Sequence, residues 1–222
     1  LSLHDALPIS INATTGTITV ATSTAGTYTV TYTTSGTCPN SATSSVTINN
    51  ADNASFTYGA AAYCKNGIDP TPTIPGPAGT FTSSPAGLSI DATTGTIDVS
   101  ASTAGTYTIT RTTSGTCPSS STGTVTINNA DNAGFSYGAP AYCKNGTNPT
   151  PTISGLPGGT FTSSPAGLTI NAATGTITVA TSTAGTYTVT YTTTGTCPNS
   201  ATFSVTINNA DNAGFSYGAA AY

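Results

Sequence analysis

Charged side chains are scarce in this chain. Among 222 residues there are three Lys or Arg and seven Asp, and there is no Glu, Met or Trp. Three cations cannot neutralise a nucleic-acid backbone or hold an anionic membrane surface. Thr, Ser or Gly interrupts every hydrophobic stretch within a few positions, so no segment reaches the roughly 20 apolar residues of a membrane-spanning helix. We therefore expect no nucleic-acid partner and no membrane insertion by this fragment.

Internal repeats organise what is present. Near-identical strings begin at three positions: ADNASFTYGAAAYCKNG at Ala51, ADNAGFSYGAPAYCKNG at Ala130 and ADNAGFSYGAAAY at Ala210. The period is therefore 79 and then 80 residues, with the extra residue in a Gly/Pro turn. We predict complete repeats at 51–129 and 130–209, the C-terminal part of a truncated repeat at 10–50, and the start of a further truncated repeat at 210–222.

Residues 1–9 match neither complete repeat. Their sequence, LSLHDALPI, resembles the translation of a common sequencing adapter. We therefore treat residues 1–9 as a foreign segment and exclude them from the fold. The only histidine, His4, lies in this segment.

The remaining array lacks the groups that catalytic sites usually combine. It has no His and no Glu, and three of its Asp residues change in the next copy: Asp69 to Asn148, Asp91 to Asn171 and Asp98 to Thr178. No base is positioned to activate the hydroxyls of the whole chain's 52 Thr and 25 Ser residues. His/Cys spacings typical of zinc sites are also absent. We predict no catalytic residues and no enzymatic activity.

Apolar residues alternate with Thr at a period of two, which is typical of half-buried strands. In TYTVTYTT, Tyr28, Val30 and Tyr32 share one face, and the middle copy places Arg111 at the last of these positions. Further short strands are separated by Gly, Pro and Asn turns, as in the hairpin GLSIDATTGTIDVS. The pattern predicts an all-β fold of tandem Ig-like antiparallel β-sandwiches in a linear array, with about seven strands per repeat.

Five cysteines occupy two repeat positions. Cys64 and Cys143 follow Ala-Tyr and are named the AYC cysteines; Cys38, Cys117 and Cys197 precede Pro in GTCP and are named the GTCP cysteines. Pairing within repeats would join Cys64 with Cys117 and Cys143 with Cys197, and leave Cys38 unpaired by truncation. Pairing across junctions would instead join Cys38 with Cys64 and Cys117 with Cys143.

We favour pairing within repeats, because closing a 53-residue loop stabilises a small domain by about 4 kcal/mol on the chain-entropy model. A long first strand would carry Cys64 to the end of the sandwich opposite Cys117, unless the chain reverses at residues 59–62. Disulfides in either arrangement predict an oxidising, secreted or cell-surface location.

Polar residues recur at the repeat junctions, where Asp52 and Asn53 align with Asp131 and Asn132. Calcium takes six to eight oxygen ligands and usually several carboxylates, whereas each junction offers one Asp. Turns built on Asx side chains explain the recurrence more simply. We therefore expect no cofactor, and we keep these four residues as an alternative calcium site.

Several segments resemble a known family. GTFTSSPAGLSI at residues 79–90, TGTI at 94–97 and TAGTY at 103–107 resemble the putative-Ig and cadherin-like modules of bacterial surface proteins. With AYCKNG and GTCPNSATFSVTI added, residues 10–222 resemble the tandem Ig-like repeats of very large secreted adhesins from Bacteroidota. The resemblance implies export to the cell surface.

The expected function is a non-catalytic extracellular repeat segment that acts as a stalk, a spacer or an adhesive region of a large bacterial adhesin. Its partners would be neighbouring repeats and an unknown surface, glycan or protein ligand. One alternative is a glycan-binding β-sandwich, with Tyr63 and Tyr142 stacking on sugars. Another is a self-assembling surface filament, because Thr-rich strand edges of low charge permit association.

Overall fold

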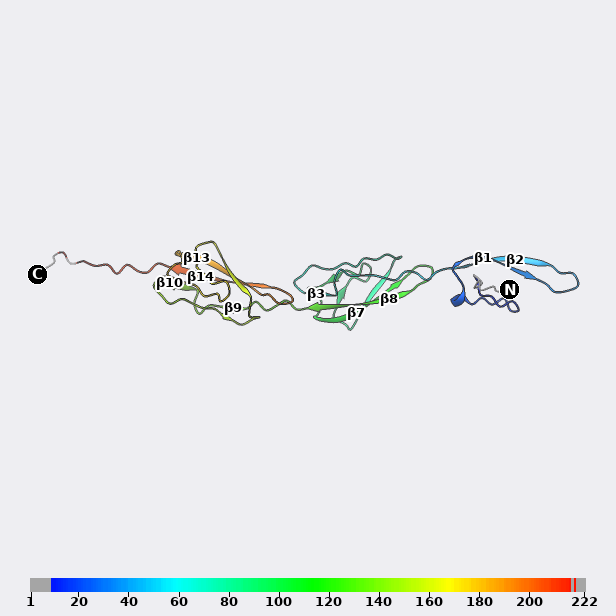
Figure 1. Ribbon diagram of the computed structural model, residues 1–222, viewed down its shortest axis with the longest axis horizontal. Coiled ribbons are helices and arrows are strands. Elements are labelled where there is room, and N and C mark those ends of the chain that lie inside the picture. Colours follow the sequence, from blue (N-terminus) through cyan, green and yellow to red (C-terminus); the bar gives the residue numbers. More distant parts are fainter. Residues whose placement is uncertain (1–8, 217, 219–222) are drawn as a thin grey trace, which may run out of the picture. The chain divides into compact units, whose positions relative to one another are not determined.

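The computed structural model describes residues 9–216 and 218, and within this range the chain is built of strands and turns with one short 3-10 helix, η1 (Val20–Thr22) (Figure 1). Most of the adapter-like segment, including His4, and the last residues of the predicted repeat at 210–222 lie outside the described residues. No helix in the described part is long and apolar enough to cross a membrane.

Each copy of the repeat contributes its own strands. The truncated first copy forms a hairpin of β1 (Gly26–Thr33) and β2 (Ser41–Ile48). The middle copy contains β3 (Ala62–Cys64), β4 (Gly79–Ser84), β5 (Ser89–Ile90), β6 (Ile97–Asp98), β7 (Gly105–Thr113) and β8 (Ser120–Asn128). The third copy contains β9 (Phe135–Ser136), β10 (Ala141–Cys143), β11 (Thr152–Ile153), β12 (Thr160–Ser164), β13 (Gly185–Thr192) and β14 (Ser200–Asn208).

The two complete copies share one sheet topology. A four-stranded sheet has the order β3-β8-β7-β4 in the middle copy and β10-β14-β13-β12 in the third. Its strands pair antiparallel, except that β3 runs parallel to β8 and β10 runs parallel to β14. Pairs outside this sheet are β5 with β6 in the middle copy and β9 with β11 in the third. Isolated bridges, Thr57↔Thr73 and Ile170↔Ile177, stand where the other copy has the corresponding pair.

Counting these bridges, each complete copy has eight paired segments where about seven strands were expected. The predicted all-β, Ig-like class is confirmed.

Alternating residues of the long hairpin strands form the core of the third copy. Tyr187, Val189 and Tyr191 on β13 are at most 3% exposed, and Val205 and Ile207 on β14 are at most 1% exposed. Burying each such side chain contributes about 1.5–3 kcal/mol. The period of two in the sequence therefore identified the inward face correctly.

Thr and Ser side chains cover the outward face and pair across the strands. Hydroxyl groups of Thr186 and Thr206 lie 3.0 Å apart, and those of Thr192 and Ser200 lie 2.9 Å apart. The same pairs recur in the other copies as Thr106 with Thr126, Thr112 with Ser120, Thr27 with Thr47 and Thr33 with Ser41. Such cross-strand pairs contribute about 0.2–1 kcal/mol each. They allow exposed strands to stay hydrated with almost no charge.

The middle copy carries a buried cation where the third copy has a tyrosine. Arg111 is 1% exposed; its guanidinium donates from Nη1 to the Asn53 carbonyl at 3.1 Å and from Nη2 to the Pro77 carbonyl. Its Nε is buried without a hydrogen-bond partner among the described residues. The guanidinium carbon lies 5.9 Å from the centre of the Phe81 ring. Arg111 is buried on the same face of β7 as Tyr107 and Ile109. Main-chain carbonyls rather than a carboxylate accept its hydrogen bonds.

By its internal contacts the chain divides into two compact units. One contains the described residues up to Ala61, Pro70–Asp98 and Tyr107–Val125, and the other contains Ala62–Asp69, Val99–Thr106 and the described residues from Thr126 onward. Strand β3 therefore lies in the same unit as the whole third copy. The repeat limits 51–129 and 130–209 stay a prediction.

Candidate functional site

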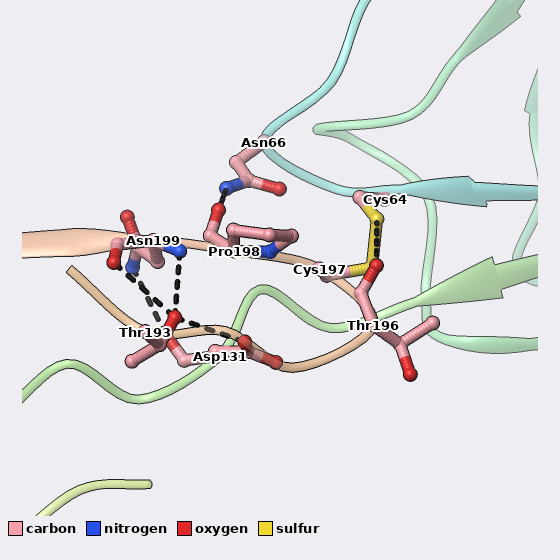
Figure 2. Close-up of a disulfide and its surroundings, with 8 residues drawn as sticks. All are labelled: Cys64, Asn66, Asp131, Thr193, Thr196, Cys197, Pro198 and Asn199. Carbon is pink, nitrogen blue, oxygen red and sulfur yellow. Dashed lines mark hydrogen bonds between the residues drawn. A yellow bond between two sulfur atoms is a disulfide. The ribbon is translucent and has the colours of Figure 1, made fainter. Parts of the chain in front are cut away.

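A disulfide joins two successive copies of the repeat. Cys64, at the end of β3 in the middle copy, is bonded to Cys197, in the turn between β13 and β14 of the third copy (Figure 2). The two residues are 133 positions apart in the sequence, and their Cα atoms are 5.5 Å apart, a separation typical of disulfides. Both belong to the same compact unit.

The predicted pairing within repeats is wrong. Neither Cys64–Cys117 nor Cys143–Cys197 forms, because Cys64 is bonded to Cys197 and the thiols of Cys38, Cys117 and Cys143 are free. The alternative pairing of the nearest cysteines across each junction does not form either. An AYC cysteine is instead bonded to the GTCP cysteine of the following repeat.

The parallel pairing of β3 with β8 explains this outcome. The register places Cys64 beside Asn128, the last residue of β8, whereas Cys117 lies in the turn before β8 begins at Ser120. A strand of this length spans about 30 Å, while disulfide-linked Cα atoms are rarely more than about 7 Å apart. Cys64 therefore lies at the end of its copy opposite Cys117. Residues 59–62 do not provide the reversal that pairing within the repeat would require.

The AYC side of the bond is a tight turn held to the end of its own copy. Gly67 N donates to the Cys64 carbonyl at 2.9 Å, and Lys65 N donates to the Asn128 carbonyl at 2.9 Å. The third copy repeats both bonds, from Gly146 N to Cys143 and from Lys144 N to Asn208, at 2.9 and 3.0 Å. The AYCKNG sequence thus builds the same surface in both complete copies.

The GTCP side is held by the aspartate at the second position of each complete copy. Asp131 N donates to the Cys197 carbonyl at 2.8 Å, and Thr193 Oγ1 donates to Asp131 Oδ2 at 2.9 Å. Asn199 Nδ2 also donates to the Asp131 carbonyl, at 3.1 Å (Figure 2). In the middle copy Asp52 N donates to the Cys117 carbonyl at 2.8 Å. Each GTCP cysteine of a complete copy therefore lies beside the start of that copy.

A polar contact accompanies the covalent bond. Asn66 Nδ2 donates to the Pro198 carbonyl at 2.8 Å, across the same two segments that the disulfide joins (Figure 2). The Cys64 sulfur also lies 3.6 Å from the Thr196 carbonyl oxygen. Sequence reasoning missed Asn66, although the recurrence of Asn in both AYCKNG strings was a usable signal.

The candidate calcium residues hold turns. Asn53 Oδ1 accepts from Ser55 N at 3.0 Å, and Asn132 Oδ1 accepts from Gly134 N at 2.9 Å. Asp131 is engaged by the GTCP turn, and Asp52 Oδ2 is buried without a partner in the described structure. No three His, Cys, Asp or Glu side chains gather into a possible metal site in the described part of the chain. Calcium binding stays the alternative stated from the sequence.

The two candidate sugar-stacking tyrosines are half-buried. Tyr142 packs against the core of the third copy, and its hydroxyl accepts a hydrogen bond from Ala139 N at 2.9 Å. Burial raises the pKa of the neighbouring Tyr137, and the nearby Tyr142 phenol adds to the rise. Tyr63 occupies the same place on β3. Glycan contact by Tyr63 and Tyr142 stays a prediction.

Aspartates elsewhere in the middle copy accept main-chain hydrogen bonds. Asp69 Oδ1 accepts from Val99 N at 2.9 Å, and Asn148 Oδ1 accepts equally from Val179 N at 3.0 Å. An amide oxygen serves this purpose as well as a carboxylate. The Asp-to-Asn change between copies therefore preserves the structure while removing the charge.

Asp91 behaves in the same way. Its Oδ1 accepts from Thr93 N and Thr94 N at 2.8 and 2.7 Å, and Asn171 makes the equivalent bonds in the third copy. Hydrogen bonds from Thr94 N first, and then from Thr93 N, lower the pKa of the Asp91 carboxyl. Its charge stabilises a surface turn.

Comparison with known proteins finds a family match for part of the chain. Residues 155–207, within the third copy, match the family described as bacterial Ig-like domain (group 3). No curated protein matches the chain.

Solved structures with similarity to the chain include cadherin domains. Protocadherin gamma B2 extracellular cadherin domains 3–6 are 12% identical with a TM-score of 0.30, and the similarity covers 84% of this chain and 59% of that one. Protocadherin gamma C5 EC1-3 is 11% identical with a TM-score of 0.34, over 94% and 88% of the two chains. Mouse cadherin-23 EC22-24 is 14% identical with a TM-score of 0.26, over 83% and 74%. Similarity this distant carries no argument about function.

Proposed function

We propose that the chain is a non-catalytic, extracellular segment of a tandem Ig-like array that acts as a stalk or spacer, or as an adhesive region, of a large bacterial cell-surface adhesin. The observation that carries this proposal is the disulfide between Cys64 and Cys197, which fixes one repeat to the next. A covalent bond between neighbouring repeats suits an array whose repeats must stay joined to one another outside the cell. Disulfides also persist mainly in oxidising compartments.

The environment of the acidic residues supports a structural role. Asp131 holds a turn, Asp69 and Asp91 accept main-chain hydrogen bonds, and Asn replaces the latter two in the next copy. A catalytic site would need several titratable groups converging on one place. The match of residues 155–207 to a bacterial Ig-like domain supports membership of a repeat array.

The location is tested on intact cells that produce the protein. Brief trypsin treatment of whole cells should release peptides of the array, with the Cys64 and Cys197 peptides still linked before reduction. A cytosolic enzyme in the same sample serves as the control for lysis. Detection of the chain only after lysis, with all five cysteines reduced, would refute an extracellular role.

Binding experiments separate a spacer from an adhesive region. A spacer should bind no glycan or extracellular-matrix protein saturably and should sediment as a monomer at all concentrations. An adhesive region should bind one of these ligands. Loss of glycan binding on changing Tyr142 to Ala, with the melting temperature retained, would favour the glycan-binding alternative.

A further inference from the structure

Each complete copy carries an AYC cysteine and a GTCP cysteine in the same local surroundings. In this chain the AYC cysteine of the middle copy is bonded to the GTCP cysteine of the third copy. Cys143 has the surroundings of Cys64: it lies beside the last residue of β14, its carbonyl accepts from Gly146 N, and Lys144 N donates to Asn208. Cys143 is nevertheless free and exposed. Its counterpart in the observed bond would be the GTCP cysteine of the repeat that begins at Ala210.

We propose that Cys143 is half of a second inter-repeat disulfide and that one pairing rule holds through the array: each AYC cysteine bonds to the GTCP cysteine of the following repeat. Under this rule Cys117 and Cys38 accept AYC cysteines from the repeats that precede their own. The three free thiols are then unjoined halves of the same kind of bond. Cys143 and the AYCKNG residues around it would therefore contact the GTCP turn of the following repeat.

The surface around Cys143 carries the polar contact as well as the thiol. Asn145 stands where Asn66 stands in the middle copy, and it is exposed. In the joined pair, Asn66 Nδ2 donates to the carbonyl of Pro198, the residue after the bonded cysteine. The GTCP sequence places a proline at this position in every copy, including Pro118. The recurring surface therefore selects a GTCP turn rather than any accessible thiol.

The positions of the two cysteines in the third copy exclude a bond between Cys143 and Cys197. Cys143 lies at the end of β14, and Cys197 lies in the turn that precedes β14. These places are separated by a nine-residue strand, which spans about 30 Å. Cys143 and Cys197 cannot meet without unfolding the sheet.

Bond formation requires an oxidant, which we take to be a small-molecule disulfide such as oxidised glutathione. The Cys143 thiolate attacks one sulfur of the oxidant, forms a mixed disulfide and releases one glutathione thiolate. The GTCP thiolate then attacks the Cys143 sulfur and releases the second glutathione thiolate. Two protein thiols lose two protons and two electrons, and the oxidant becomes two thiols. The inference rests on the proposed function because an extracellular setting supplies such an oxidant.

The test uses the full chain with residues 130–209 inserted a second time directly after Asn209. The protein is refolded in a glutathione redox buffer, and its disulfides are mapped without reduction. Cys143 should be linked to the inserted GTCP cysteine, while Cys64 stays linked to Cys197. The chain should gain one disulfide, and its free thiols should remain three, as in the original chain.

Two matched variants test the bond and its recognition. Changing the inserted GTCP cysteine to Ser should leave Cys143 open to alkylation and Cys64–Cys197 unchanged. Changing Asn145 to Ala should slow formation of the new bond several-fold under limiting oxidant, with the Cys64–Cys197 rate unchanged. Equal rates in Asn145→Ala and the parent would refute recognition by this contact.

A linkage of Cys143 to Cys117 or Cys197, or a free Cys143 beside an intact Cys64–Cys197 bond, would overturn the pairing rule. These outcomes concern the purified protein alone. Failure of the pairing rule would therefore leave the cell-surface role standing. Conversely, if the protein proved to be intracellular, a second disulfide mapped in the purified protein would still support the pairing rule.

Discussion

Arg111 places a charge inside the middle copy at the position that Tyr191 occupies in the third. Tyr191 is fully buried, its hydroxyl donates to the Leu156 carbonyl at 2.6 Å, and it accepts from Gly159 N at 2.9 Å. Arg111 is equally buried, but its Nε lacks a partner among the described residues. An incompletely paired buried cation costs more than a hydrogen-bonded phenol of similar size.

Changing Arg111 to Tyr should therefore raise the free energy of unfolding of the middle copy, by about 1–2 kcal/mol. Urea unfolding of the full chain, followed by hydrogen exchange in the middle copy, measures the change. The reciprocal variant, Tyr191→Arg, should destabilise the third copy by about 3 kcal/mol or more. A lower free energy of unfolding in Arg111→Tyr than in the parent chain would contradict this prediction.

Asp91 gives the middle copy a pH dependence that the third copy lacks. Its pKa is lowered in the folded state, so the carboxylate stabilises the fold above its unfolded pKa of about 4. This stabilisation is lost as the pH falls through the lower, folded pKa. The Asn171 turn has the same hydrogen bonds without a titrating group.

The variant Asp91→Asn should therefore lose less stability than the parent between pH 6 and pH 2.5, as measured by urea midpoints in the middle copy. Introducing the carboxylate into the third copy, as Asn171→Asp, should add the same dependence there. Identical pH profiles for the parent and Asp91→Asn would contradict the stabilisation of the charged form by Thr93 and Thr94.

At the scale of elements, the junction aspartate fixes the GTCP turn to the start of its own repeat. Removal of the Asp131 carboxylate leaves the buried Thr193 hydroxyl without this acceptor. We expect Asp131→Ala to lower the free energy of unfolding of the third copy by about 1–2 kcal/mol. Thermal unfolding with and without millimolar Ca²⁺ measures this loss and calcium binding together.

Because the junction oxygens already hold turns, calcium should not raise the melting temperature of the parent chain. Asp131→Asn, which retains one carbonyl oxygen as an acceptor, should lose less stability than Asp131→Ala. A calcium-dependent rise in melting temperature that disappears in Asp131→Ala would instead establish the alternative metal site.

Elements with a strong local pattern were predictable, and the disulfide was not. The alternation in TYTVTYT specifies which residues of β13 face inward, because neighbouring strand residues point to opposite faces. The location of Cys64 depends on a three-residue strand, β3, that pairs in parallel with β8 across 64 sequence positions. Nothing local in Ala-Tyr-Cys specifies that partner or its direction. The choice between Cys117 and Cys197 follows from that single pairing.

The turn residues were partly predictable from the sequence. Recurrence of Asp52 and Asp131 pointed to a shared role, and Asx turns were correctly expected from Asn53 and Asn132. The hydrogen bond from Thr193 to Asp131 joins residues 62 positions apart. A contact at that separation depends on the complete sandwich, so its existence could not be read from the junction sequence.

At the scale of the whole molecule, the disulfide closes a loop between residues 133 positions apart. On the chain-entropy model, such a loop stabilises the folded chain by at most about 5 kcal/mol. The double variant Cys64→Ser/Cys197→Ser should therefore melt at a lower temperature than the parent. The matched control, Cys117→Ser/Cys143→Ser, removes two free thiols and should melt as the parent does. Equal melting of both double variants would show that the bond contributes little to stability.

The same bond also determines how the chain responds to tension. When the chain is pulled from its two ends, force passes from Cys64 to Cys197 through the sulfur atoms, so the residues between them add no extension even when unfolded. Reduction should lengthen the fully stretched chain by about 450 Å, from the 133 positions released at about 3.4 Å each. Single-molecule pulling with and without reductant measures this difference. In an array joined throughout by such bonds, two covalent paths would run side by side, and unfolding of a repeat would extend the array far less than its sequence length permits.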